Sequence, residues 1–445
     1  MSQVERLPEA SGRNPWFDFS SYKDHQFNSH SEIKDNYDYV VVGAGFGGVF
    51  AALRLAELSP ESSIALFDAL PIGLFSSGRN AGFVSKAQIA KSLVGRQVFS
   101  LEDQKQLLHL NTQIVDKFEQ IIKEKNLHIN WRHDGMYKAV KQAKCKHDLK
   151  LLAHYFDELE VDYKLFGKEE TDARLGTHFY DESMYIPETA LINPAEAIRG
   201  FASALPKNVS VFENCPIIEV NEGQTPSIKL ASGKVIKSKK IILTVNAFLK
   251  AFGIGKVTNP VAAIHSFGAV TRELTEEELT QFKDVQPWGI TGTHPVSCTV
   301  RYTPYKRIFV RTDIAFATHL NINPERLNQS VKMLKTAFDR RFPELVDANF
   351  EYIYGGLISF TGNTYPLFGE VKQNVYAGVC GDGSGVTRAA ILGHYLADLI
   401  FKVDTKELDY IKQYYHPSYL PPEPFRTIGA DIAIAYKNFK AGIEV

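Results

Sequence analysis

The sequence predicts a mixed α/β fold, α+β overall, in which two kinds of segment alternate along the chain. Near both ends, an apolar strand leads through a glycine-rich turn into an apolar helix, at residues 37–58 and 374–400. Between them, longer β segments run from Pro260 to about residue 361. We therefore expect a discontinuous Rossmann-like unit, interleaved with a unit built on a mainly antiparallel sheet.

Composition and charge exclude several classes of protein. The hydrophobic fraction of 44% and the charged fraction of 23% are ordinary for a globular protein. The formal net charge of −1 gives no electrostatic case for binding nucleic acid or an anionic membrane. The sequence contains no run of about 18 apolar residues, and its polar first 36 residues do not resemble a secretory signal.

The cysteines form no CxxC pair, no zinc spacing and no disulfide framework. They are Cys145, Cys215, Cys298 and Cys380. We therefore expect reduced thiols, no metal site and a cytoplasmic protein. Residues 1–36 form an extension before the first strand, and the aromatic segment at residues 14–19 should pack on the surface or on a second subunit.

The first strand leads into a dinucleotide-binding turn. Gly43 permits a tight turn, Gly45 allows close approach of a pyrophosphate, and Gly48 allows the helix to pack closely on the strand. The helix from about Phe46 presents free N–H groups and its positive dipole end to phosphates. The second strand ends in Asp68, about 20 residues beyond Gly48, where a ribose acceptor usually lies. A carboxylate there disfavours NADP.

Beyond Asp68, hydrophobic periodicity predicts the elements in order. A glycine- and serine-rich loop at residues 73–84 is unlike a crossover helix. Helices are predicted at residues 87–97, 101–125, 146–159, from near Pro194, and at Glu325–Arg341. Strands are predicted at residues 136–140, 210–220, Ile241–Val245, 261–274, 297–303 and 307–316, with a hairpin around Ser232–Gly233.

These elements define the expected domain boundaries. The nucleotide-binding unit should comprise residues 37–90, 188–258 and 362–402, and the substrate unit residues 91–187 and 259–361. Residues 403–445 form a C-terminal tail. A nicotinamide-dependent dehydrogenase, the weaker alternative, does not need a second glycine-rich turn near its C-terminus. A flavoprotein does, because the isoalloxazine ring must also be held, so FAD is the expected cofactor.

The chain resembles the D-amino-acid-oxidase-like flavoproteins, in the branch that contains gamma-glutamylputrescine oxidase, glycine oxidase and monomeric sarcosine oxidase. Six ordered segments carry the resemblance: VVVGAGFGG, SSGRNAGF, ALINPAEAIRGFASAL, KKIILTVNAF, YGGLISFTGNTYPLFGEV and VYAGVCGDGSGVTRAAILGHYLADLI. The tail segment YLPPEPFRTIGADIA is also similar to the gamma-glutamylputrescine oxidase branch.

The resemblance implies FAD bound in an extended form. It places the pyrophosphate at Gly43, Gly45, Phe46 and Gly48, the ribose at Asp68, and the adenine near the backbone of Ile217. It places further residues along the pyrophosphate and flavin: Ser77, Arg79, Asn80, Ala81, Gly82, Gly381, Asp382, Gly383, Ser384, Gly385, Val386 and Thr387. The family more often has Glu where this chain has Asp68.

The resemblance also bears on flavin attachment. Monomeric sarcosine oxidase tethers its flavin to a cysteine in the segment that matches YGGLISFTGNTYPLF, which contains no cysteine in this chain. Cys380 lies one strand later and fits a small buried residue beside the turn. We therefore expect non-covalent FAD.

The reaction that the resemblance implies is oxidation of the C–N bond of an amine or amino acid, with O₂ or another electron acceptor. Arg311 replaces a residue that is often glycine in relatives and is the candidate ligand for a substrate anion, with an ion pair to Asp313 as the alternative. Arg301 is a second candidate ligand and Arg307 a weaker one.

Two other side chains are candidates near the flavin. His265 lies on a strand expected to cover the flavin and could exchange a proton, or it could be satisfied within the sheet. Tyr354 is a candidate wall of the amine pocket, with a simple core role as the alternative. For the whole chain, the alternatives are a dehydrogenase that reduces a quinone or electron carrier, and a flavin-binding partner subunit with a degenerate substrate site.

Overall fold

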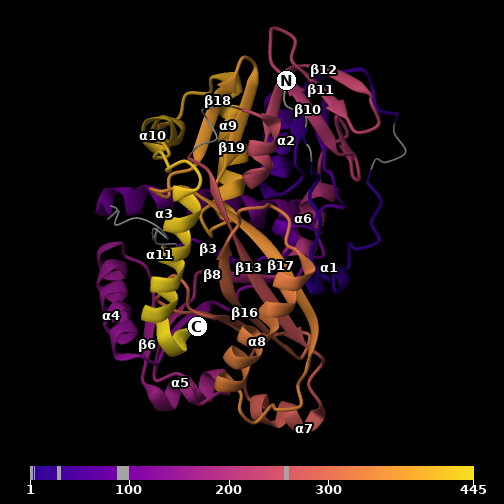
Figure 1. The fold of residues 1–445 in the computed structure, drawn as a ribbon. Helices are drawn as coiled ribbons and strands as arrows, with labels where there is room; N and C mark the ends of the chain where they lie inside the picture. Colours follow the sequence, from indigo (N-terminus) through magenta and orange to yellow (C-terminus); the bar gives the residue numbers. More distant parts are fainter. Residues whose placement is uncertain (1–3, 5, 28–31, 88–99, 255–259) are drawn as a thin grey trace.

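The computed structural model describes residues 4, 6–27, 32–87, 100–254 and 260–445 (Figure 1). The helix expected at residues 87–97 lies outside these residues except for Ala87. Three sheets and their covering helices make up the described chain, which confirms the predicted mixed α/β class.

The first sheet contains the strands that lead into both glycine turns. Five parallel strands have the order β19, β12, β1, β2, β9. Their bounds are Val375–Val379, Val235–Leu243, Asn36–Val42, Ile64–Phe67 and Val209–Phe212. Antiparallel strands extend the sheet: β10 (Ile217–Asn221), β11 (Ser227–Leu230) and β18 (Leu367–Lys372). The central strands read as apolar runs because helices and loops cover both faces.

Helices α2 (Phe46–Leu58) and α9 (Thr387–Phe401) follow the two glycine turns and pack against each other. Their contact is close because Gly393 lies against the Gly47 carbonyl, where a Cβ would collide. Helices α3 (Leu101–Glu124) and α6 (Pro194–Ser203) complete this layer, and α6 begins at Pro194 as predicted.

The second sheet has the order β17, β13, β16, β15, β14, β5, β7, β6, and only the β14–β5 pair is parallel. Its later strands are β13 (Ala262–Thr271), β14 (Trp288–Thr291), β15 (Thr299–Thr303), β16 (Arg307–Phe316) and β17 (Phe350–Phe360). Its earlier strands are β5 (Met136–Val140), β6 (Lys164–Phe166) and β7 (Glu182–Ile186). Helix α8 (Pro324–Arg341) packs on β13, β16 and β17.

The remaining elements belong to neither large sheet. A third sheet has the order β3 (Phe83–Ser85), β8 (Thr189–Ile192), β4 (Trp131–Arg132). The remaining helices are α1 (Pro15–Asp18), α4 (Ala143–Glu158), α5 (Lys168–Leu175), α7 (Glu276–Leu279), α10 (Lys406–Tyr414) and α11 (Phe425–Ala441). Figure 1 shows α11, in yellow, crossing the front of the molecule.

Most predicted elements are present, but the strand predicted over residues 210–220 is wrong. The chain forms β9, turns at Asn214 with a φ of 55°, and resumes as β10 after Pro216. The tail prediction also missed α10 and α11. The first sheet takes its strands from residues 36–67, 209–243 and 367–379, and the second from 136–186 and 262–360. We therefore propose the domain boundaries stated above.

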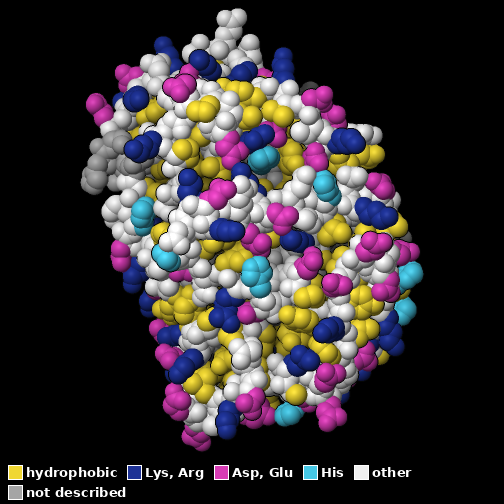
Figure 2. Space-filling view, turned by 180° about the vertical axis from the view of Figure 1, so that it is seen from behind, with side chains coloured by type: hydrophobic (Ala, Val, Ile, Leu, Met, Phe, Trp, Pro, Cys, Tyr) yellow, Lys and Arg dark blue, Asp and Glu magenta, His cyan; other side chains and the backbone are white. Residues whose placement is uncertain are grey.

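The surface agrees with the low net charge. On the face shown in Figure 2, basic and acidic side chains are interspersed. Among the described residues, no helix is both long and apolar enough to span a membrane. The same residues contain no cluster of three or more His, Cys, Asp or Glu side chains suited to a metal ion.

Candidate active site

A long cavity lies at the carboxyl ends of the parallel strands, where open α/β sheets bind ligands. Val42, Phe67, Thr244 and Val379, at the ends of β1, β2, β12 and β19, line it. The loop at residues 73–80 and Ser359 of β17 also line it, so the second sheet contributes to its wall. Both glycine turns predicted from the sequence therefore meet at one cavity.

The three glycines of the first turn have different roles. Gly43 has a φ of 96°, which only glycine adopts readily, and it makes the tight turn. A Cβ on Gly48 would collide with the Gly43 carbonyl, so Gly48 is required for packing. Gly45 has extended backbone angles, and a Cβ there would enter the cavity next to the Ser77 hydroxyl. The cavity at Gly45 is thus a cradle that a side chain would fill.

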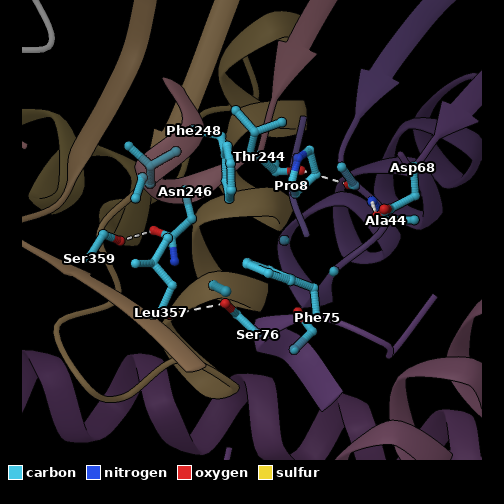
Figure 3. Close-up of a pocket in the computed structure, with 18 of the residues that line it drawn as sticks. Pro8, Ala44, Asp68, Phe75, Ser76, Thr244, Asn246, Phe248, Leu357 and Ser359 are labelled. Atoms are coloured by element: carbon cyan, nitrogen blue, oxygen red, sulfur yellow. Dashed lines mark hydrogen bonds between the residues drawn. The ribbon is translucent and has the colours of Figure 1, made fainter. Parts of the chain in front are cut away.

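Asp68 closes the other side of this turn (Figure 3). Its carboxylate accepts hydrogen bonds from the backbone N–H of Ala44 (2.8 Å) and of Leu70 (3.0 Å). Burial raises its pKa to about 6 despite these donors. Ile217 lines the same end of the cavity. A carboxylate beside a glycine turn and a helix N-terminus fits the adenosine and pyrophosphate of a dinucleotide.

The loop after β2 is held rigidly. The buried Arg79 guanidinium donates to four backbone carbonyls, of Ser11, Gly12, Leu74 and Gly355. Asn80 closes the turn by accepting from the Gly82 N–H (2.9 Å). Ser77 and Asn80 line the cofactor cavity, whereas Arg79, Ala81 and Gly82 line its continuation toward the second sheet.

The second glycine turn, at residues 381–387, faces both parts of the cavity. Gly381, Asp382, Gly383 and Gly385 line the cofactor part. Asp382, Gly383, Ser384, Gly385 and Val386 line the part under the second sheet, and Thr387 begins α9. Backbone N–H groups and a helix N-terminus are thus presented at this point, which favours an anionic group.

The carboxylate of Asp382 is unusual in this turn. Both oxygens are buried and make no well-formed hydrogen bond within the described residues. Burial raises the pKa of Asp382 to about 7, against the opposing influence of the Arg388 guanidinium and the Thr361 N–H. The carboxyl group of the flavin-free protein is therefore largely protonated in mildly acidic solution.

This pKa shift makes stability depend on pH. The folded pKa lies above the value of about 3.9 in an unfolded chain, so the folded state binds the proton more tightly and the contribution of Asp382 to stability falls as pH rises from 4 to 7. In the Asp382→Asn variant, we expect the free energy of unfolding to fall by about 3 kcal/mol less over this pH range than in the parent protein. Urea unfolding of flavin-free protein at pH 5 and pH 8 measures it. Parallel profiles for the variant and the parent protein would contradict this expectation.

The continuation of the cavity lies against the second sheet. Its wall includes Ser266 and Gly268 of β13, Thr299 of β15, Phe309 and Arg311 of β16, and Tyr354 and Gly356 of β17. Ser76, Asn80, Asp382 and Gly383 line both parts, so the two parts adjoin. We call this continuation the substrate-side cavity.

Arg311 is a cation in this cavity without a carboxylate partner among the described residues. Its guanidinium donates to the hydroxyls of Thr299 (2.8 Å) and Ser266 (3.3 Å), and burial lowers its pKa. The alternative pairing with Asp313 is absent, because Asp313 forms a bidentate ion pair with Arg326 at 2.7 and 2.8 Å. A partly buried guanidinium that lines a cavity and is bound only to hydroxyls is suited to an anionic ligand.

Tyr354 lines the same cavity from β17 and is almost fully buried. Its hydroxyl accepts a hydrogen bond from Trp16 Nε1 (2.9 Å), and burial raises its pKa. The ring therefore forms a fixed wall. A hydroxyl with a raised pKa is not a base at neutral pH.

Three of the predicted residues lie elsewhere. His265 lies on the face of β13 covered by α8, with Phe267, whereas Ile264 and Ser266 line the cavity. Burial lowers the pKa of His265. Arg301 is buried and donates to the carbonyls of Ala81 and Ile192, both at 2.8 Å. The expectation that His265 faces the flavin and that Arg301 is accessible to substrate is therefore wrong.

Arg307 is also structural, since it donates to the Thr271 carbonyl and pairs with Glu351. Sequence reasoning missed Thr299, Ser266 and Lys138, which line the substrate-side cavity. Strand alternation contained a signal for Lys138, because Met136, two residues earlier on β5, lines the same cavity.

This arrangement is that of a dinucleotide-dependent oxidoreductase, with a cofactor cavity on a parallel sheet and a substrate cavity on an antiparallel one. The sequence matches the family described as FAD dependent oxidoreductase over residues 38–399, and the chain belongs to that family. It is therefore an FAD-dependent oxidoreductase.

Known relatives agree with this assignment. The probable oxidoreductase OrdL of Haemophilus influenzae is 21% identical over 436 residues, which cover 96% of each chain. The gamma-glutamylputrescine oxidoreductase of Escherichia coli is 23% identical over 376 residues, covering 82% of this chain and 83% of the relative. A glycine oxidase structure from Geobacillus kaustophilus matches with a TM-score of 0.68 at 14% identity, over 84% of this chain and 96% of the oxidase.

Proposed function

We propose that the chain oxidises the C–N bond of an amine or amino acid that carries an acidic group near its nitrogen. The observation that carries the proposal is Arg311, a partly buried guanidinium in the substrate-side cavity that has hydroxyl partners and no carboxylate partner among the described residues. A substrate carboxylate would supply the missing charge. One similar fold belongs to an oxidase named for glycine. In glycine, the carboxylate is bonded to the carbon that carries the amine.

The cofactor would be held without a covalent bond. Gly43, Gly45, Phe46 and Asp68 would hold the pyrophosphate and ribose, with Ile217 at the adenine, and the turn at residues 381–387 would receive the flavin. When bound, FAD accepts a hydride from the carbon next to the substrate nitrogen. Cys380 lines the cofactor cavity, but burial raises the pKa of its thiol, which disfavours the reactive thiolate.

The residues of the chain position the substrate for this transfer. Arg311, with Thr299 and Ser266, would bind the acidic group, and Tyr354 would restrict the position of the amine. The substrate carbon loses a hydride and the nitrogen a proton. The resulting imine takes up water and yields a carbonyl compound and an amine or ammonia.

The electron acceptor separates two versions of this function. An oxidase would pass the electrons to O₂, and a dehydrogenase to a quinone or an electron carrier. Oxygen uptake during turnover of an amine identifies an oxidase. Reduction of a dye without oxygen uptake identifies a dehydrogenase. A flavin-binding partner subunit with a degenerate site would show neither, and that result would refute the proposed reaction.

Non-covalent attachment gives a direct prediction. Acid or heat denaturation of the purified protein should release all of its FAD into the supernatant, because burial raises the pKa of both thiols that line the cavity, Cys215 and Cys380, and so disfavours the reactive thiolates. Absorbance of the supernatant and of the washed precipitate measures the partition. Flavin that stays with the precipitated chain would show a covalent bond.

A further inference from the structure

The N-terminal extension lies before the family-matched residues 38–399, yet it forms part of the cofactor cavity. Val4, Leu7 and Pro8 line that cavity. Figure 3 draws Pro8 among the residues that line the cavity, together with Thr244 and Ala44. The extension therefore forms part of the cavity wall, although it is remote in sequence from the glycine turns that line the same cavity.

This segment crosses from one sheet to the other. Val4 donates its N–H to the Ile218 carbonyl of β10, at 2.9 Å, in the first sheet. Asn321, in the loop before α8, bonds the segment twice: Nδ2 donates to the Leu7 carbonyl (2.9 Å), and Oδ1 accepts from the Glu9 N–H (3.2 Å). Ser11 then accepts from the Gly355 N–H of β17 (3.1 Å) in the second sheet.

The next residues are anchored more firmly. Asn14 donates to the carbonyls of Gly73 (3.1 Å) and Gly78 (2.9 Å), in the loop that borders the cofactor cavity. Trp16 is 1% exposed and donates to the Tyr354 hydroxyl. Figure 1 places α1, which contains Trp16, beside β17. The segment is thus fixed at Asn14 and Trp16 and more weakly held before Ser11.

We propose that residues 6–16, which we call the strap, retain the cofactor by closing the cavity after the cofactor has bound. The weakly held part, residues 6–10, opens for entry and release, and the buried part, Asn14 to Trp16, serves as its hinge. The two bonds from Asn321 are exposed, so they can break without disturbing the core. The proposal takes the identity of the cofactor from the family and is independent of the substrate.

The test measures the rate at which FAD leaves the holoenzyme after dilution, as the rise in flavin fluorescence. Deletion of residues 2–10 removes the cavity-lining Leu7 and Pro8 and keeps Ser11, Asn14 and Trp16, and we expect release at least tenfold faster. Asn321→Ala removes both exposed bonds without altering a cavity residue, and we expect release several-fold faster. Asn208→Ala, a matched control whose amide bonds the Ser62 carbonyl, should leave the rate unchanged.

Circular dichroism melting of the flavin-free proteins serves as the folding control. An unchanged rate of FAD release in both the deletion variant and Asn321→Ala would overturn the proposal that the strap retains the cofactor. Equal acceleration in Asn208→Ala would also overturn it, because the effect would then be general destabilisation. No substrate enters this measurement, so the failure of every amine to reduce the flavin would refute the proposed reaction and leave the strap standing.

Discussion

Gly45→Val should abolish FAD binding and leave the chain folded. The backbone at Gly45 is extended, with φ −76° and ψ −174°, so valine meets no conformational strain. Its side chain would enter the cofactor cavity toward Ser77, where the pyrophosphate is expected. Ser77 can rotate away from the new side chain, but a phosphate held by the N-terminus of α2 cannot.

Two other glycines provide controls for this substitution. Gly48→Ala should prevent folding, because its Cβ would collide with the Gly43 carbonyl. Gly429→Ala, on α11 in open space, should change neither folding nor flavin content. Flavin absorbance per chain after reconstitution, together with circular dichroism, separates these outcomes. A Gly45→Val protein that retains stoichiometric FAD would show that the pyrophosphate does not lie at this turn.

Arg311→Ala should lower kcat/KM for an acidic substrate by about 10- to 100-fold, the usual worth of hydrogen bonds to a charged group. The loss should appear mainly in KM, because the guanidinium would bind the substrate carboxylate equally in the ground state and in the transition state. A neutral amine of the same shape should be little affected. The comparison of the two substrates isolates charge recognition from damage to the fold.

Arg307→Ala is the matched control for Arg311, since it removes an arginine from the same strand. Arg307 pairs with Glu351 and does not contact the substrate-side cavity in the described structure. It should not distinguish acidic from neutral substrates. Equal losses for both substrates in Arg311→Ala would show that Arg311 is structural and would remove the main support for an acidic substrate.

The glycine turns could be predicted from the sequence because their chemistry is local. Gly43 needs a positive φ, and Gly48 needs close contact with the Gly43 carbonyl five residues earlier. Both requirements appear as spacing in one short motif. The alternation of side chains along β16 likewise made Arg311 a candidate ligand for a substrate anion. The turn at residues 381–387 lies far away in sequence, but it repeats the same strand, turn and helix pattern.

The errors concern contacts that alternation alone cannot assign. The alternation of side chains along β13 predicts that His265 and Ser266 face opposite sides of the sheet. It does not predict which side α8 covers and which side faces the cavity. The contacts of Arg301 could not be predicted because its two acceptors are far from it in sequence: Ala81 lies in the loop before β3, and Ile192 ends β8. Trp16 has no periodic pattern around it, and its bond to Tyr354 spans most of the chain.

Anaerobic reduction of the bound flavin tests the central claim most directly. The holoenzyme is mixed without oxygen with a panel of amines, N-methyl amino acids, D-amino acids and polyamines, and the oxidised flavin absorbance is followed. The account predicts rapid bleaching by at least one compound that carries a carboxylate near its nitrogen, and little by its neutral analogue. If dithionite bleaches the flavin while no compound in the panel does, the proposed C–N oxidation is wrong.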